Sequence, residues 1–282
     1  MTTTAPLNQV LDSMRIPTLP ASVERIRALL AMPDVSMPEV VKAFLQDPPL
    51  AAKALKIANS VHYGLRTQTT SVQTAIPVLG LRTLAIIVLR AGVLSVYADT
   101  KDCAGFSLQD FWKHSILTGH VGEDLARRCR RRGTDMSPQD YYTCGLLHDL
   151  GKIVLYDNLG EQYVDVVRRA STAKSALVAE EARLLGMSHA DVGSVAALMW
   201  RLPETIAAVI RCHHRPTALT GMVDIVNIVS CADEIAHAVA NAPSAEPKNL
   251  LSAIATRPGG LSVESLVESI TDALASWQKI EL

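Results

Sequence analysis

The sequence of 282 residues is poor in aromatic side chains. Phe, Trp and Tyr together make up 4% of the chain, whereas hydrophobic residues as a group reach 49%. β-Sandwiches are rich in aromatic residues, so a core with few aromatics that is built largely from Ala, Leu, Val and Ile is more typical of helices. No segment alternates apolar and polar residues for long. We therefore expect an all-α fold.

The chain also lacks an excess of charge of either sign. Lys and Arg number 27 against 28 for Asp and Glu, which gives a formal net charge of -1. A chain without a basic excess has no overall field to attract the phosphates of nucleic acids or an acidic membrane surface. This balance argues against a general nucleic-acid binder.

Signals for export or membrane insertion are missing as well. Residues 1–10 have neither the basic start nor the apolar stretch of a signal peptide. The most apolar segment, 83–98, is short for a membrane span and contains Arg90. We expect a soluble cytoplasmic protein that does not bind membranes.

Cysteine is scarce and unpatterned. The five cysteines are odd in number, widely spread and never arranged as Cys-x-x-Cys. This pattern argues against a disulfide framework and against a thiolate zinc site. We interpret these residues as small apolar side chains of a reducing compartment.

Helix start and stop signals divide the chain into two regions. Short helices with clear caps fill the first hundred residues, as at Asp47-Pro48, and Gly80 is placed to end a helix that begins near Ser71. Longer helices follow, one from Ser107 to about Arg132 and another from Ser137 to Gly151. The polar break near residue 100 predicts a flexible N-terminus over 1–15, an N-terminal helical module over 16–100, and a helical domain with a C-terminal helix over 101–282.

The sharpest local motif is Gly145-Leu-Leu-His148-Asp149-Leu-Gly151-Lys152. An adjacent His and Asp at a helix end bring an imidazole nitrogen and a carboxylate oxygen within reach of one cation, and Gly151 would let the chain turn away. Nitrogen and oxygen ligands together suit Fe, Mn, Zn or Mg. Alternatively, the pair is a helix-end His beside a solvated Asp.

Further imidazoles and carboxylates recur on the predicted helices. These additional candidates are Asp110, His114, His189, His213, His214 and Asp233. Asp110 lies four residues before His114, so both project from one helix face. The pair His213-His214 ends a helix, where the helix dipole alone could favour it. Each residue alone is more often structural, but their recurrence on five helices points to a shared metal site.

These residues carry a resemblance that covers nearly the whole chain. The front half resembles the HDOD family of bacterial signalling proteins through Ile16-Pro-Thr-Leu-Pro20, residues 47–60 and residues 71–80. The back half resembles the HD superfamily of metal-dependent phosphohydrolases. The motifs that carry this second resemblance are Trp112-Lys-His114-Ser, the His148–Lys152 motif, Gly186–Gly193, Trp200–Glu204, His213–Pro216 and Ala232-Asp233. It implies an HD-type helical bundle packed against the N-terminal helical module.

The resemblance also implies roles for individual residues. The core HD ligands would be His114, His148, Asp149 and Asp233. The positions that HD-GYP phosphodiesterases use for a second or third metal are matched by Asp110, His189, His213 and His214. The family usually has Glu where this chain has Asp110, which is one methylene shorter. Lys152 matches a lysine near the substrate phosphate, so Asp149 and Lys152 are the expected catalytic residues around two or more divalent metal ions.

One departure limits what the resemblance implies. After His214 the chain reads Arg215-Pro-Thr-Ala-Leu-Thr-Gly221, where HD-GYP enzymes have a Gly-x-Gly-Tyr-Pro loop, so cleavage of cyclic di-GMP is not implied. HDOD proteins are generally regarded as regulatory modules. We expect a metal-binding regulatory protein that acts on a signalling partner or a nucleotide ligand. The alternative is a metal-dependent phosphohydrolase or phosphodiesterase of a nucleotide or phosphoester.

A basic run, Arg127-Arg-Cys-Arg-Arg-Arg132, has two interpretations. Solvated charge at a helix C-terminus is favoured by the helix dipole. The functional alternative is a docking site for a nucleotide phosphate or an acidic partner.

Overall fold

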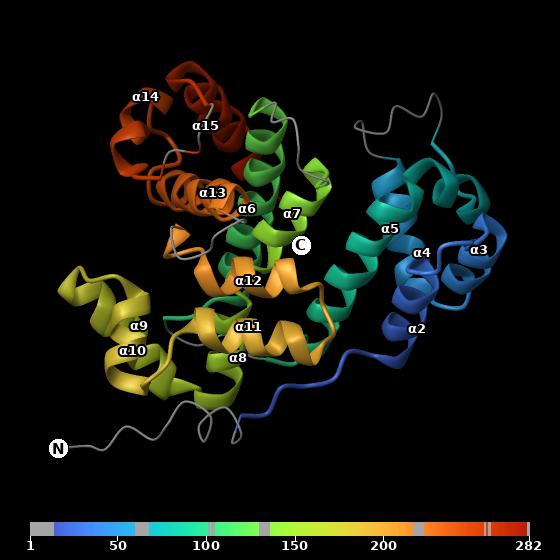
Figure 1. The fold of residues 1–282 in the computed structure, drawn as a ribbon, viewed down its shortest axis with the longest axis horizontal. Coiled ribbons are helices and arrows are strands. Elements are labelled where there is room, and N and C mark those ends of the chain that lie inside the picture. The colour runs from blue at the N-terminus through green and yellow to red at the C-terminus, as the bar shows by residue number, and fades with distance from the viewer. Residues whose placement is uncertain are drawn as a thin grey trace. The chain divides into compact units, whose positions relative to one another are not determined.

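The computed structural model describes residues 14–59, 68–100, 102, 105–129, 136–216, 223–256, 258 and 261–280. The described chain is helical and contains no β-strand, which confirms the predicted all-α class (Figure 1). Two compact units are present, an N-terminal unit of Pro17–Asp99 and a C-terminal unit of Thr100–Leu282 together with Met1–Ile16. Most of the predicted flexible N-terminus, residues 1–13, lies outside the described residues.

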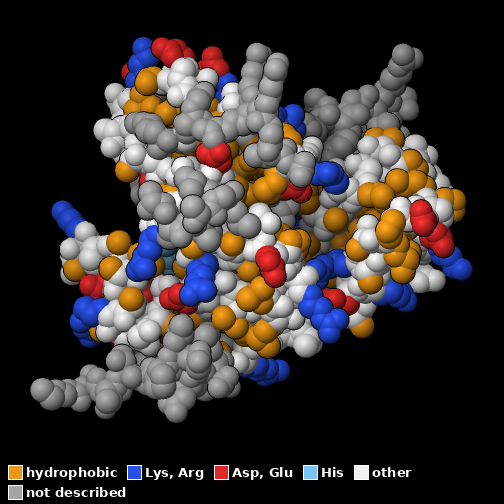
Figure 2. Space-filling view, viewed as in Figure 1, with side chains coloured by type: hydrophobic (Ala, Val, Ile, Leu, Met, Phe, Trp, Pro, Cys, Tyr) orange, Lys and Arg blue, Asp and Glu red, His pale blue; other side chains and the backbone are white. Residues whose placement is uncertain are grey.

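The N-terminal unit is built from short capped helices around one long helix. Its helices are α2 (Ala21–Leu30), α3 (Met37–Leu45), α4 (Pro48–Ala58) and α5 (Val72–Val96). A capping box of Ser36 and Glu39 begins α3, and the Asp47 carboxylate accepts a hydrogen bond from the Leu50 N–H at 3.1 Å to begin α4. Hydrophobic side chains gather over the surface of this unit in Figure 2.

Helix α5 is the hydrophobic centre of the N-terminal unit. It is 25 residues long across a kink, so only the whole helix reaches the length of a membrane span, while the apolar segment 83–98 by itself is shorter. Among the described residues it is the one helix with the length and hydropathy of a span, but 44% of its most apolar window is buried, and α2, α3 and α4 pack on it. Gly80 interrupts it with φ 72° and ψ 161°, at the position where the sequence predicts a helix end. The helix is therefore a kinked core helix.

The C-terminal unit is a bundle of helices. They are α6 (Leu108–Arg128), α7 (Pro138–Leu147), α8 (Leu150–Leu159), α9 (Glu161–Ala173), α10 (Leu177–Leu185), α11 (His189–Met199), α12 (Glu204–Cys212), α13 (Val223–Asn241), α14 (Pro247–Leu250) and α15 (Val263–Trp277), with a 3-10 turn at Leu251–Ala253. Helix α6 packs against α7, α13 and α15, while α11 packs against both α8 and α12. These packings bring helices that are distant in sequence around the junction of α7 and α8.

Two glycines allow close helix contacts on either side of that junction. A Cβ on Gly145 would lie 2.7 Å from the Thr118 carbonyl oxygen, and one on Gly151 would lie 1.8 Å from the His189 carbonyl oxygen. Gly151 was predicted to end a helix, and this was wrong: the preceding helix ends at Leu147, and Gly151 lies in α8. Its lack of a side chain instead lets α8 approach the start of α11.

The arginine run is partly accounted for by ion pairs. Helix α6 ends at Arg128 rather than near Arg132. Arg127 pairs with Glu123, while Arg128 pairs with Asp124 at 2.6 Å, with Asp272 at 2.9 Å and with Glu268. The last two partners lie on α15, so Arg128 joins the two helices. Residues 130–132 lie outside the described chain.

Candidate metal centre

Five segments of the C-terminal unit position the candidate ligands. His114 lies on α6, His189 begins α11 and Asp233 lies on α13. The remaining ligands stand at helix ends: His148 and Asp149 between α7 and α8, and His213 and His214 after α12. His148, Asp149, His189 and His213 are at most 2% exposed. The helix packing thus gathers these four side chains inside the bundle, whereas His214 is exposed.

One cluster consists of His114, His148, Asp149 and Asp233, whose donor atoms lie within 4.8 Å of one another. His148 Nε2 is 3.2 Å from Asp149 Oδ2 and 3.3 Å from Asp233 Oδ1. His114 Nε2 is 3.1 Å from the same Asp233 oxygen. We call this group cluster A.

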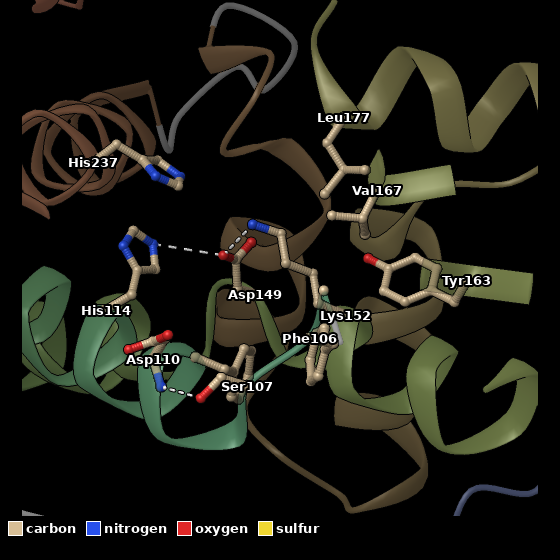
Figure 3. A pocket seen from close by; sticks show the side chains of 12 residues that line it. Phe106, Ser107, Asp110, His114, Asp149, Lys152, Tyr163, Val167, Leu177 and His237 are labelled. Carbon is tan, nitrogen blue, oxygen red and sulfur yellow. Dashed lines mark hydrogen bonds and ion pairs between the residues drawn. The ribbon is translucent and has the colours of Figure 1, made fainter. Parts of the chain in front are cut away.

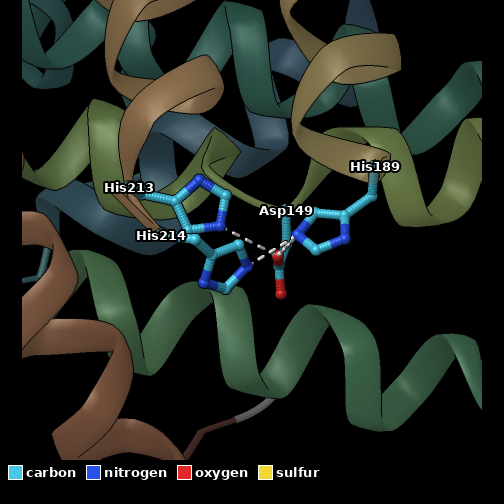
Figure 4. A group of neighbouring side chains, drawn as sticks. All are labelled: Asp149, His189, His213 and His214. Carbon is cyan, nitrogen blue, oxygen red and sulfur yellow. Dashed lines mark hydrogen bonds and ion pairs between the residues drawn. The ribbon is translucent and has the colours of Figure 1, made fainter. Parts of the chain in front are cut away.

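A second cluster consists of Asp149, His189, His213 and His214 (Figure 4). Asp149 Oδ1 lies 3.3 Å from His189 Nε2 and 3.6 Å from His213 Nε2, and His189 Nε2 lies 2.9 Å from His214 Nε2. We call this group cluster B. Asp149 belongs to both clusters and turns Oδ2 toward cluster A and Oδ1 toward cluster B, as a carboxylate that bridges two cations would.

The other ring nitrogen of three imidazoles is held by an acceptor. Nδ1 of His148 donates to the Gly145 carbonyl and Nδ1 of His213 to the Ile210 carbonyl, each at 2.7 Å. His189 Nδ1 donates to Glu181 Oε2 at 2.6 Å. With Nδ1 held as a donor in this way, the neutral form of each ring would present the lone pair of Nε2 to the clusters. This arrangement is typical of metal-binding histidines.

Unsatisfied buried atoms provide a test of whether these residues fit a cation. Asp149 Oδ1, Asp233 Oδ1 and His213 Nε2 are buried, and in the described chain their contacts of 3.1–3.6 Å with one another and with neighbouring imidazoles lack hydrogen-bond geometry. A buried polar atom without a partner costs about 1–3 kcal/mol. A cation bound among these atoms would remove that cost, so the donor set fits a metal ion.

The pKa shifts in cluster A also favour a bound cation. Burial acts to lower the pKa of His148, but the charges of Asp149 and Asp233 outweigh it and raise that pKa to about 10. Burial and the neighbouring imidazoles instead lower the pKa of His114 to about 4, although Asp233 opposes this shift. Without a metal, one protonated imidazole therefore stands between two carboxylates. A divalent cation would replace that proton on binding.

Cluster B holds its outer imidazole neutral. Burial, followed by the charge of His213 and then of His189, lowers the pKa of His214 to about 2. Burial also lowers the pKa of His213, although Asp149 opposes the shift. Neutral imidazoles are the form that binds a metal.

Lys152 and Asp110 lie beside the clusters, in a pocket of about 470 Å³ (Figure 3). Lys152 Nζ donates to Asp149 Oδ2 at 2.5 Å, and the carboxylates around it raise its pKa despite burial. Asp110 is exposed and belongs to neither cluster of the described residues. Its backbone N–H donates to Ser107 Oγ, which caps α6. The structure therefore brings together every other predicted ligand but leaves Asp110 at the pocket wall.

Three residues near the clusters, namely His237, Glu181 and Tyr163, were not identified from the sequence. His237 Nε2 lies 3.3 Å from Asp233 Oδ1, and its ring centroid is 4.3 Å from that of His114. Its spacing of four residues after Asp233 on one helix was the signal that could have identified it. Glu181, fully buried beside His189, accepts a hydrogen bond from the Tyr163 hydroxyl at 2.7 Å. Nothing in the sequence separates Glu181 from its neighbour Glu180.

The His and Asp clusters in a helical bundle place the chain in the class of all-α proteins with a candidate metal site. Sequence comparison then identifies its family. The HDOD domain model matches residues 16–216, so the chain belongs to the HDOD family. An uncharacterized protein of Treponema pallidum is 28% identical over 199 residues, which cover 71% of this chain but 37% of that protein. The chain thus matches little more than a third of that relative.

Solved structures show the same fold. An HDOD domain protein of unknown function from Geobacter sulfurreducens is 26% identical with a TM-score of 0.75, and the match covers 98% of this chain and 97% of that chain. A candidate phosphohydrolase from Shewanella amazonensis is 20% identical with a TM-score of 0.77 over 99% of both chains. The HDOD-like fold therefore extends beyond the residues that the family model matches.

Proposed function

We propose that this protein is a bacterial, cytoplasmic signal-transduction protein whose C-terminal unit binds two divalent metal ions, one in each cluster. The observation that carries the proposal is the shared Asp149, whose two oxygens face separate sets of imidazoles. Membership of the HDOD family supports the regulatory role. The ions would be held by His114, His148, Asp149 and Asp233 in cluster A and by Asp149, His189, His213 and His214 in cluster B.

The donor types narrow the choice of metal. Both clusters combine imidazole nitrogen with carboxylate oxygen, and cluster B has three imidazoles to one carboxylate. Imidazole suits Zn and Fe, carboxylate suits Mn and Mg, and Mg²⁺ strongly prefers oxygen ligands. We therefore propose Fe, Mn or Zn rather than Mg. Metal occupancy would control contact with a signalling partner or a nucleotide.

Hydrolysis of a phosphoester is the second candidate function, and the pocket beside cluster A favours it. His114, Asp149, Lys152 and His237 all line this pocket. Bound divalent ions would polarise a phosphoryl group and lower the pKa of a bound water. Lys152, whose raised pKa keeps it charged, would attract the substrate phosphate and hold the Asp149 carboxylate in place.

Metal analysis of protein purified without chelator tests the first proposal. We expect about two ions per chain in the wild type and almost none in the double variant His148→Ala with Asp149→Ala, because the variant removes donors from both clusters. His120→Ala is the matched control, since His120 is exposed on α6 and belongs to neither cluster. Failure of the wild type to retain or take up Fe, Mn or Zn would contradict the proposal.

Activity toward bis(p-nitrophenyl) phosphate with added Mn²⁺ tests the second candidate. We expect turnover to disappear in the same double variant and to persist in His120→Ala. Metal binding without turnover would favour the regulatory role alone. Equal turnover in the double variant would show that the activity belongs to a contaminant.

A further inference from the structure

A second cavity lies entirely within the N-terminal unit and is independent of the metal clusters. This groove has a volume of about 730 Å³ and is lined by residues of α2, α4 and α5 together with flanking positions. Its apolar walls include Val23, Leu50 and Leu94. Pockets for small ligands span roughly 300–1,000 Å³ with mostly apolar walls, so the groove has the size and lining of a ligand site.

Positive charge is concentrated at this groove. Lys53 and Lys56 of α4 both line it. Burial lowers the pKa of the half-buried Lys53, and the charges of Arg90 and then Lys56 lower it further. The charges that act on Lys53 are thus cationic, whereas a structural lysine in a folded protein is usually placed beside a carboxylate.

Arg90 is not among the residues that line the groove, but it lies close enough for its charge to act on Lys53. Its Nε is buried and has no hydrogen-bond partner in the described chain. The groove is lined by one carboxylate, that of Asp47, whose Oδ1 accepts the hydrogen bond from the Leu50 N–H. Holding like charges together costs free energy. An anion in the groove would offset the repulsion that the neighbouring cations exert on Lys53.

We propose that this groove binds a small amphipathic anion, with a phosphate, sulfonate or carboxylate at Lys53 and Lys56 and an apolar body along Val23, Leu50 and Leu94. Among the described residues no aromatic side chain lines the groove, so burial of the apolar body, rather than stacking, would contribute to affinity. Binding there would give the N-terminal unit a chemical input of its own, separate from the metal centre.

The fluorescent anion 1-anilinonaphthalene-8-sulfonate is a suitable probe, because it joins a sulfonate to an apolar body. We expect saturable binding to the full-length protein and a loss of affinity of about tenfold in Lys53→Gln, since a charge-assisted hydrogen bond is removed. Ala52→Trp should block the probe without changing charge, because exposed Ala52 lines the groove. Lys42→Gln is the matched control: Lys42 is exposed in the same unit but lies outside the groove lining.

Two further measurements make the test specific. Inorganic phosphate should compete with the probe in the wild type and compete less in Lys53→Gln. The variant His148→Ala with Asp149→Ala should bind the probe as the wild type does, so failure of the metal proposal would not affect this result. Circular dichroism and thermal unfolding verify that each variant is folded. Equal probe affinity in folded wild type, Lys53→Gln and Ala52→Trp would overturn the proposal, as would displacement by an acidic peptide but not by phosphate.

Discussion

The two units of this protein differ in what they bury. Every buried polar or charged residue of the described chain belongs to the C-terminal unit, from His114 to Ser269. The described core of the N-terminal unit is hydrophobic, with Ile26, Phe44 and Leu84 fully buried. Burying a charge is costly, so a core that keeps Asp149 and Asp233 is less stable than a well-packed apolar core would be. The N-terminal unit carries its charge at a surface groove instead.

Substitution of Asp149, the carboxylate shared by both clusters, would remove this difference between the two units most completely. Asp149→Asn keeps the shape of the side chain but removes the charge that both clusters share. We expect metal content to fall from about two ions per chain to near zero, whereas Asp110→Asn should change it little because Asp110 belongs to neither cluster. Metal analysis checks both variants. Retention of one ion in Asp149→Asn would show that the clusters are independent.

The next largest effect concerns the contact between α8 and α11 at Gly151. Gly151→Ala would place a Cβ 1.8 Å from the His189 carbonyl oxygen, so α8 and α11 must separate. We expect the free energy of unfolding to fall by more than about 3 kcal/mol, above the usual cost of overpacking. Chemical denaturation measures this loss. A loss of unfolding free energy below about 1 kcal/mol would mean that α8 and α11 are packed less tightly than the 1.8 Å approach implies.

The buried Glu181 allows the two clusters to be separated. Burial and the Glu181 carboxylate raise the pKa of Tyr163 well above its ordinary value, so its hydroxyl stays protonated and donates to Glu181, which in turn orients His189. In Glu181→Gln we expect affinity for the cluster B ion to fall about 10–100-fold and affinity for the cluster A ion to stay unchanged. Stepwise cobalt titration, followed by visible absorption, resolves the two events. Equal weakening of both ions would point to a general loss of structure.

The smallest effect belongs to the N-terminal unit. Gly80→Ala meets no atom within 4 Å, so its cost comes from the backbone alone, at φ 72° and ψ 161°. We expect a loss of about 1–3 kcal/mol in the free energy of unfolding, since this region is essentially restricted to glycine. Metal content should remain that of the wild type. A change in metal content would mean that the N-terminal unit contributes to the centre.

Much of the fold could be predicted because helix signals are local. The caps at Asp47 and Ser107 and the break at Gly80 are decided by neighbouring residues, and the structure has them where they were predicted. The role of Gly151 was not predictable in this way, because its constraint comes from the His189 carbonyl on another helix.

The candidate site, too, was predictable where the signal is local and not where it depends on contacts between helices. The histidines and aspartates stand out by residue type, so the sequence identified most of the clustered donors. Asp110 was assigned by its spacing from His114, yet spacing fixes only the helix face, and its side chain lies at the exposed first turn of α6. Glu181 was missed because its burial depends on how α9 and α10 pack, which no local pattern reveals.

The distribution of the donors along the chain has a consequence for folding. The candidate ligands run from residue 114 to residue 233 on five separate segments. An ion that binds them would close several chain loops at once, and the entropy of closing such loops grows only slowly with their length. A bound ion would therefore act as a reversible cross-link, available only to a chain that has already brought distant helices together.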